Sequence, residues 1–338
     1  MTNKIFIEKV LDGRITNDIM RKALNWIGLS DAVKRNSKIF IKPNFTFPSF
    51  KRGVTTSPEY IEMLVRVLKE NTDDITIGES DGGYNSWKAE AAFKGHNLEY
   101  ISKKYNVKLV NLCKTEKTSI QVVKQNITYN VPFPRFLKEE TNIFITMPVP
   151  KVHCMTGVSL SMKNQWGLIP DTMRMKYHHI FNEAILELNK VFSNYFVVAD
   201  GTYILNTTGP MFGDPLKKDM IIASNNFGSF EAALCEIMSI NIHDIPHLKF
   251  AQTKGFIPKK IEDIEFNKKV LEFKYQSNLV ISNRSKITRK VFKSKCLTYV
   301  LYTSLFGRFI HEIYYLFSKN RKDINKSSEG ESCENTTY

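Results

Sequence analysis

Residues 151–171 place several groups that bind anions or carry protons in one short stretch, directly after an apolar run. This stretch, KVHCMTGVSLSMKNQWGLIPD, holds four side chains that could contact a ligand: Lys151, His153, Lys163 and Asn164. A lysine ammonium is a compact charge that suits phosphate or carboxylate. Thr156, close to a possible helix start, would add a hydroxyl donor. If residues 157–165 form a helix, Ser159 and Lys163 share one face of it. The pattern predicts a site for a small anionic ligand.

Histidines and carboxylates elsewhere in the chain extend this chemistry. His153 could exchange a proton, bind a metal, or pack with its ring nitrogens bonded to the backbone. His178 and His179 are adjacent, so at most one of them can face a given site. A set made of Glu79, His153, His178 and Asp200 would suit a divalent metal. No local spacing such as His-x-x-x-His supports this set, so it depends on the fold.

Roles follow from these residue types. We assign catalytic roles to His153, Lys163 and Asp200. We assign substrate-binding roles to Lys42, Asn44, Lys151, Thr156 and Asn164. The carboxylates Glu79 and Asp200 could equally cap the turns that follow them. The loop GESDGG (78–83) lacks both the phosphate-loop lysine and the Rossmann glycine spacing, which argues against a dinucleotide site.

Strand-like and helix-like segments alternate along the chain. Strands are predicted over 37–44, 74–80, 107–112, 141–150, 195–201 and 219–225, and helices over 55–70, 89–105, 179–192 and 229–240. In the first helix, Ser57 can cap and Pro58 can take the first position. Residues 117–137 are more polar and could form a hairpin. This pattern predicts an α/β fold with a mostly parallel sheet and helices on both faces. The sequence does not decide whether this fold forms one lobe or two.

Four predicted strand ends carry polar groups. They are Lys42 with Asn44, Glu79 with Ser80, Lys151 with His153, and Asp200. In open α/β sheets, ligands bind beyond the carboxyl ends of the strands. We therefore expect the fold to gather these positions around one site.

Ordered motifs then indicate a family. They are Lys-Pro-Asn (42–44), Gly-Glu-Ser (78–80), Lys-x-His-x-x-Thr-Gly-Val-Ser (151–159), Lys-Asn (163–164), Gly167, Pro170, His178-His179, Asp200-Gly201, and Gly209-Pro210 with Gly213. Over about residues 3–255 the chain resembles the family known as domain of unknown function 362. This family has no settled reaction, and many members carry a ferredoxin-like iron–sulfur module.

The chain departs from that family in two ways. It has no Cys-x-x-Cys-x-x-Cys run, so it has no iron–sulfur cluster motif. After the segment IIAS, where the family usually has acidic residues, it has Asn225 and Asn226, followed later by Glu231. A role that needs an aspartate near position 226 is therefore unsupported.

Composition places limits on the class of protein. The 338 residues have a net charge of +14, and the five cysteines are widely spread, which fits free thiols in a reducing compartment. Charges interrupt the N-terminal stretch, so no secretory signal is recognisable. We predict a cytoplasmic protein with an unidentified cofactor, for which a divalent metal is one candidate.

The C-terminal part differs from the rest. Residues 284–326 hold eleven basic and two acidic side chains, a net charge of +9, whereas the tail, 327–338, carries −3. The apolar stretch 296–317 is interrupted by Arg308, His311 and Glu312, which favours a helix lying on a membrane surface over a spanning one. We divide the chain into an α/β domain (1–283), a basic amphipathic helical extension and a flexible tail. The extension could instead dock on its own domain or a second copy; nucleic acid is disfavoured.

Three functions remain open. The first is an enzyme that binds a small phosphorylated or carboxylated substrate at the strand ends, with peripheral attachment to the inner face of a membrane through residues 284–326. The second is a cluster-free accessory or redox partner of an iron–sulfur protein system. The third is a non-catalytic membrane-associated scaffold.

Overall fold

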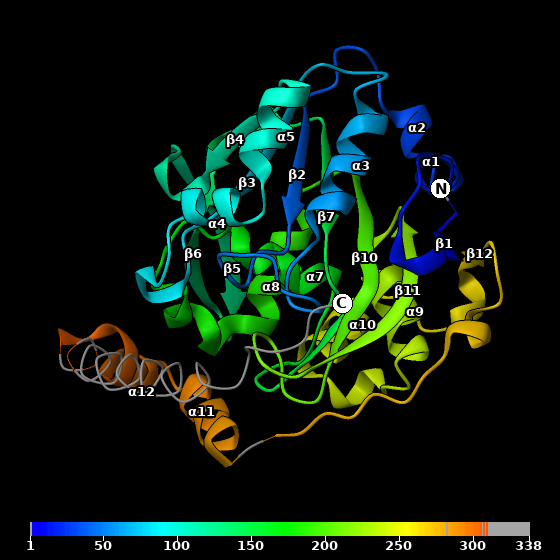
Figure 1. The fold of residues 1–338 in the computed structure, drawn as a ribbon. Helices are drawn as coiled ribbons and strands as arrows, with labels where there is room; N and C mark the ends of the chain where they lie inside the picture. Colours follow the sequence, from blue (N-terminus) through cyan, green and yellow to red (C-terminus); the bar gives the residue numbers. More distant parts are fainter. Residues whose placement is uncertain (1, 282, 306, 308, 310–338) are drawn as a thin grey trace, which may run out of the picture.

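A β-sheet runs through the middle of the molecule, with helices packed on both faces (Figure 1). The structure is a computed structural model and describes residues 2–281, 283–305, 307 and 309. The strands of the sheet are β1 (Lys4–Lys9), β2 (Ile39–Pro43), β3 (Ile75–Glu79), β4 (Lys108–Asn111), β7 (Ile143–Met147), β8 (Lys151–His153), β9 (Gly157–Ser159), β10 (Tyr195–Asn206), β11 (Asp214–Ser224) and β12 (Glu265–Phe266).

The strand order is β12-β1-β11-β10-β7-β2-β3-β4, and β8 pairs with both β10 and β9. Strands β10, β7, β2, β3 and β4 are all parallel, while β11 is antiparallel to its neighbours β10 and β1. The predicted α/β class, with a mostly parallel sheet, is confirmed. A separate hairpin, β5 (Lys117–Lys124) with β6 (Ile127–Pro134), occupies the region where the sequence suggested one.

The helices fall into two layers and an extension. They are α1 (Asn17–Trp26), α2 (Leu29–Ala32), α3 (Pro58–Leu68), α4 (Ala89–Gly95), α5 (Leu98–Tyr105), α6 (Arg135–Glu139), α7 (Ser161–Asn164), α8 (Phe181–Lys190), α9 (Phe227–Ile237), α10 (Pro246–Thr253), α11 (Asn283–Lys293) and α12 (Lys295–Thr298). Helix α3 begins as predicted, because the Ser57 hydroxyl accepts the Tyr60 N–H and Pro58 follows it.

Two hydrophobic clusters cover the two faces of the sheet. Alternating residues of a strand point to opposite faces, so Ile39 and Ile41 pack with α1, α3 and α5, while Phe40 packs with α8, α9 and the hairpin. All three side chains are at most 2% exposed. Strands buried on both faces explain why the sequence reads as continuous apolar runs.

Two predicted helices differ from the structure. Residues 89–105 form two helices, α4 and α5, because Gly95 packs against the Pro48 carbonyl and Asn97 adopts a left-handed backbone with φ of 56°. The helix over 157–165 that a shared face for Ser159 and Lys163 would require does not form. Gly157, with φ of 85°, belongs to β9, and the helix α7 begins only at Ser161. Ser159 and Lys163 therefore share no helix face.

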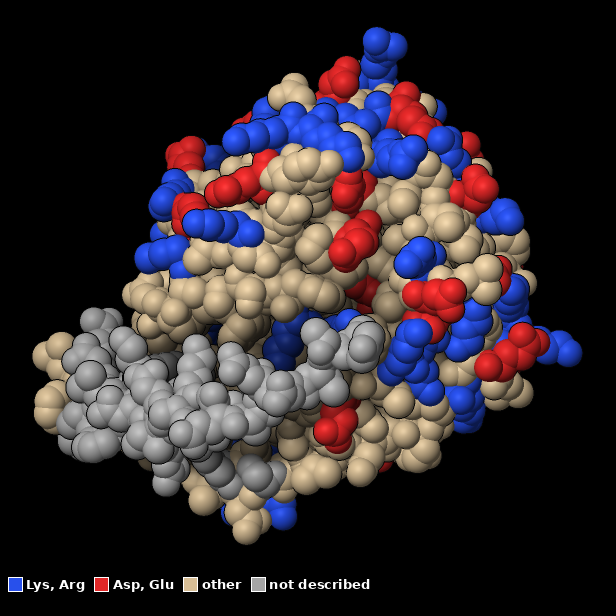
Figure 2. Space-filling model, in the orientation of Figure 1, with Lys and Arg blue, Asp and Glu red and all other residues tan. Residues whose placement is uncertain are grey.

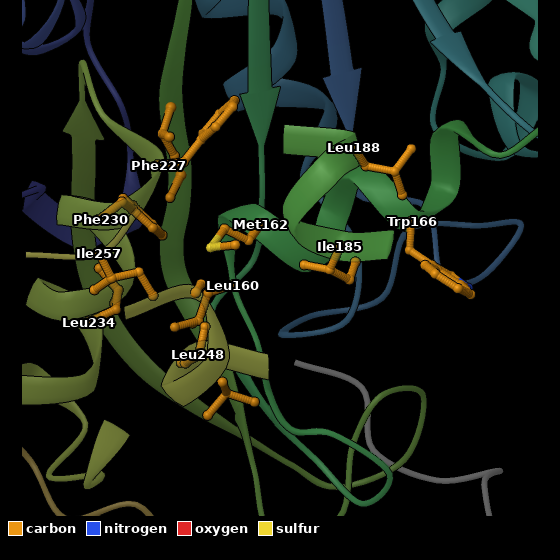
Figure 3. Close-up of a cluster of buried hydrophobic side chains, with 14 of the residues drawn as sticks. Leu160, Met162, Trp166, Ile185, Leu188, Phe227, Phe230, Leu234, Leu248 and Ile257 are labelled. Carbon is orange, nitrogen blue, oxygen red and sulfur yellow. The ribbon is translucent and has the colours of Figure 1, made fainter. Parts of the chain in front are cut away.

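Helix α7 is held firmly although it is only one turn long. Glu231 of α9 accepts the Met162 N–H at 2.7 Å and the Ser161 hydroxyl at 2.8 Å. Burial raises the pKa of Glu231 to about 7. Figure 3 shows the side chain of Met162 within a cluster that also contains Leu160, Phe230, Leu234, Leu248 and Ile257. This anchoring positions the next two residues, Lys163 and Asn164.

The C-terminal extension begins with helices. Helices α11 and α12 lie below the main body in Figure 1, and α11 contacts the segment Arg174–Ile180. The remainder of the predicted extension and the tail 327–338 lie outside the described residues. Of the helices that the structure describes, none combines the length and the apolar character that crossing a membrane requires.

Candidate functional site

A cavity of about 370 Å³ lies where β2, β3 and β8 end, and we call it the strand-end cavity. Its lining includes eight residues with groups that could act on a ligand: Lys42, Asn44, Glu79, His153, Lys163, Asn164, Arg174 and His178. Figure 2 shows a hollow near the middle of one face of the molecule, with lysine and arginine atoms deep inside it. The fold thus gathers most of the predicted residues, and Thr156 also lines the cavity.

A buried ion pair forms the floor of this region. Lys42 Nζ lies 2.6 Å from Glu79 Oε2, and the two side chains are 1% and 5% exposed. The Pro43 carbonyl accepts a second hydrogen bond from Lys42 at 2.7 Å. Burial lowers the pKa of Lys42, and the neighbouring Glu79 opposes that shift. Gly167 leaves room for the pair, since a Cβ there would lie 3.0 Å from Glu79 Oε1 and 3.2 Å from Lys42 Nζ.

Asparagines connect the ends of neighbouring strands. Asn44 donates to Asn164 Oδ1 at 3.1 Å, and Asn164 donates to Thr146 Oγ1 at 2.8 Å. Asn44 Oδ1 also accepts a hydrogen bond from Lys151 Nζ at 3.0 Å. Lys151 is fully buried, donates to the Val54 carbonyl as well, and does not line the strand-end cavity. Lys151 therefore positions Asn44 and does not reach a ligand in this cavity.

His153 enters the cavity as a neutral ring. Burial lowers the pKa of His153 well below its usual range, and the nearby Lys163 and Lys151 lower it further. Its Nδ1 accepts the Met155 N–H at 3.0 Å, which leaves the ring proton on Nε2. His153 can thus donate a hydrogen bond from Nε2 to a ligand.

Lys163 is the cation with the fewest constraints in the cavity. It is half-buried, and its ammonium has no hydrogen-bond or ion-pair partner among the described residues. Burial lowers the pKa of Lys163 to about 8, an effect that Arg174 strengthens and Cys154 opposes. A half-buried charge without a counterion is well suited to bind an anion.

Arg174 is a cavity residue that the sequence analysis missed. It precedes His178 in the segment Arg174–Ile180, and its guanidinium donates to the Asp81 carbonyl at 2.9 Å. Arg174 lies between two elements of the family pattern, Pro170 and His178, but no local motif singles it out. Arg174 is the third cation in the lining, after Lys42 and Lys163. Among the described lining residues, Glu79 is the single carboxylate that balances these three positive charges.

His178 contributes a second neutral imidazole. Its Nδ1 lies 3.1 Å from the Met175 carbonyl, so Nδ1 carries the proton. Burial and the charge of Lys163 lower the pKa of His178 to about 3. The ring is surrounded by aromatic side chains, with Phe292 of α11 4.5 Å away and Trp166 5.1 Å away between centroids.

Asp200 does not join this group. It lines a different cavity, together with Ser57 and Thr202, and its oxygens accept the N–H groups of those two residues at 2.9 and 3.1 Å. Burial raises the pKa of Asp200. Its bond to Thr202 matches the alternative that Asp200 caps the turn after it, and its bond to Ser57 holds the residue that caps α3. Within the described residues, no three His, Cys, Asp or Glu side chains form a group that could hold a metal ion.

The comparisons agree with the family that the motifs indicated. The model of the family described as Domain of unknown function (DUF362) matches residues 39–236, more than half of the chain. Thylakoid-associated protein sll1697 of Synechocystis sp. is 22% identical over 245 residues, which cover 70% of this chain and 73% of that protein. A crystal structure of a Thermotoga maritima protein matches with a TM-score of 0.38 and 12% identity. The match covers 62% of this chain and 55% of that one.

Replacing Asp200 separates a capping role from a catalytic one. Asp200→Ala leaves two backbone N–H groups without their acceptors, so we expect the free energy of unfolding to fall by about 2 kcal/mol or more. Binding of sulfate at a temperature where the variant is folded should be unchanged. Chemical denaturation and calorimetry measure the two effects. The exposed Asp73→Ala should change stability by no more than about 0.5 kcal/mol. A stable Asp200→Ala that no longer binds sulfate would contradict this assignment.

Proposed function

Given that this chain belongs to the family Domain of unknown function (DUF362), we propose that it is an enzyme acting on a small phosphorylated or carboxylated substrate. The substrate binds in the strand-end cavity. The observation that carries this proposal is the set of three cations around one already paired carboxylate, with Lys163 lacking any partner among the described residues. An anionic ligand would supply the missing counterion.

The chain's own groups divide the work within this cavity. Lys163 and Arg174 hold the anionic group, with Arg174 fixed in place by its bonds to backbone carbonyls. His153 donates a hydrogen bond from Nε2 to a substrate oxygen. The Lys42–Glu79 pair and the asparagines Asn44 and Asn164 keep these groups at fixed positions.

The extension supports a second proposal, that the chain attaches to an anionic membrane surface. Its described part exposes Lys286, Lys290 and Lys295 together with Ile287 and Leu297, which are 65% and 48% exposed. Basic and apolar side chains side by side on a helix are typical of segments that lie in a lipid interface. The thylakoid association stated for the Synechocystis relative is consistent with this proposal.

Removing Lys163 tests anion binding. We expect Lys163→Ala to weaken the binding of inorganic phosphate by at least about tenfold, because a charge-assisted hydrogen bond is lost. Isothermal titration calorimetry measures this, and circular dichroism confirms that the variant is folded. Lys190→Ala removes an exposed lysine whose only partner among the described residues is the carboxylate of Glu187, and should bind phosphate as the wild type does. Equal affinity of the wild type and Lys163→Ala would refute the proposed site.

The lowered pKa of Lys163 predicts how anion binding depends on pH. Its ammonium is present below its pKa of about 8 and is lost as the pH rises through that value. Affinity for sulfate, whose charge does not change in this range, should therefore be flat near about pH 7 and fall up to about tenfold per unit above about pH 8. Lys163→Arg keeps its charge and should show no such fall. A flat wild-type profile up to about pH 10 would argue against Lys163 as the anion ligand.

Charge reversal on α11 tests membrane attachment. Lys286→Glu with Lys290→Glu should lower binding to vesicles rich in phosphatidylserine by at least about tenfold at low salt, since each basic residue near such a surface contributes about 1 kcal/mol. Vesicle co-sedimentation measures the bound fraction. Lys22→Glu with Lys103→Glu changes the charge equally on the α/β body and should bind like the wild type. Similar losses in both pairs would show that net charge, and not α11, governs attachment.

A further inference from the structure

A second cavity, of about 570 Å³, lies beside the strand-end cavity, and we call it the adjacent cavity. Four residues line both cavities: Met155, Thr156, His178 and Phe292. Shared lining residues mean that single side chains separate parts of the two cavities. A ligand that occupies the strand-end cavity can therefore extend into the adjacent one when these side chains change rotamer.

The adjacent cavity combines charged and apolar groups, and its cations are Lys124, Arg289 and Lys293. Much of its lining consists of aliphatic and aromatic side chains: Phe181, Ile240, Ile245, Leu279, Ile281 and Phe292. Burying hydrocarbon against such apolar side chains is favourable in proportion to the area removed from water.

Arg289 of α11 provides a polar group at the boundary. Its Nε donates to the Cys154 carbonyl at 2.7 Å, and Cys154 directly follows His153. The Nη2 of Arg289 is buried and has no hydrogen-bond partner among the described residues. A ligand oxygen between the two cavities could accept this unused hydrogen bond.

The outer side of the same wall carries the features of a lipid-facing helix. Phe292 of α11 is buried against His178, while Ile287 of α11 is 65% exposed near the exposed lysines Lys286 and Lys290. One helix thus contributes to the lining of both cavities and exposes basic and apolar side chains. A molecule drawn from a membrane surface would meet this helix first.

We propose that the substrate is an anionic amphiphile, with its phosphate or carboxylate head in the strand-end cavity and a hydrocarbon chain in the adjacent cavity. This inference rests on the proposed function, because the head occupies the anion site built by Lys163 and Arg174. Arg289 then hydrogen-bonds an oxygen near the junction of head and chain.

The length of the ligand's hydrocarbon is the decisive variable. Calorimetric titration of the full-length protein with butyl phosphate and octyl phosphate, both below micelle-forming concentrations, compares ligands with the same head group. A buried methylene increases affinity about fourfold, so four additional ones should tighten binding by at least about tenfold, with one ligand per chain. The carboxylates butyrate and octanoate should show the same order, and the stronger pair identifies the head group.

Filling the adjacent cavity should remove this dependence. In Leu279→Trp, octyl phosphate should bind no more than about twofold tighter than butyl phosphate, while butyl phosphate should bind as it does to the wild type. Asn182→Trp fills the same cavity from α8 and serves if the first variant does not fold. Leu271→Trp, at a side chain that is 70% exposed and lines neither cavity, should keep the wild-type preference.

The outcomes separate the two proposals. If butyl phosphate binds and octyl phosphate binds no tighter, the amphiphile inference is wrong and the anion site stands. If Leu279→Trp and Asn182→Trp both keep the full preference for octyl phosphate, the hydrocarbon of the ligand lies outside the adjacent cavity and the inference is likewise overturned. If none of these anions binds, the proposed function itself fails.

Discussion

The burial of two lysines, Lys42 near the end of β2 and Lys151 at the start of β8, is the constraint on which the rest of the site depends. Lys42 and Lys151 are at most 1% exposed, and an ammonium out of water is costly unless acceptors surround it. Lys42 finds Glu79 and the Pro43 carbonyl, and Lys151 finds Asn44 and the Val54 carbonyl. These bonds join segments that are up to 107 residues apart and so fix the shape of the cavity.

Against this fully bonded background, Lys163 is the exception. It follows Met162, which the core and Glu231 hold in place, so its backbone is rigid while its ammonium faces the cavity unpaired among the described residues. The ammonium groups of Lys42 and Lys151 have hydrogen-bond acceptors, whereas the half-buried ammonium of Lys163 is available to bind an anionic ligand. The neutral imidazoles of His153 and His178 add hydrogen-bonding capacity to the cavity without adding charge.

The described part of the C-terminal extension contacts the site, which is the docking on its own domain that the sequence analysis left open as an alternative. The sequence treats the basic segment as a separate feature, because its charge density changes abruptly there. In the structure, Phe292 packs against His178 and Arg289 bonds to the residue after His153. Any surface that α11 contacts therefore lies close to the two cavities.

The sequence by itself determined the class of fold, the start of α3, and the fact that polar residues end several strands. These depend on local periodicity, capping residues and turn chemistry, all of which operate over a few positions. Only the tertiary structure decided which polar ends meet. Asp200 lies in a different cavity, and Lys151 is buried behind Asn44. Residues 157–164 form a strand and one helical turn, and Arg174 joins the cavity lining. Side-chain direction at a strand end depends on packing against segments that are distant in sequence, and no local pattern encodes that packing.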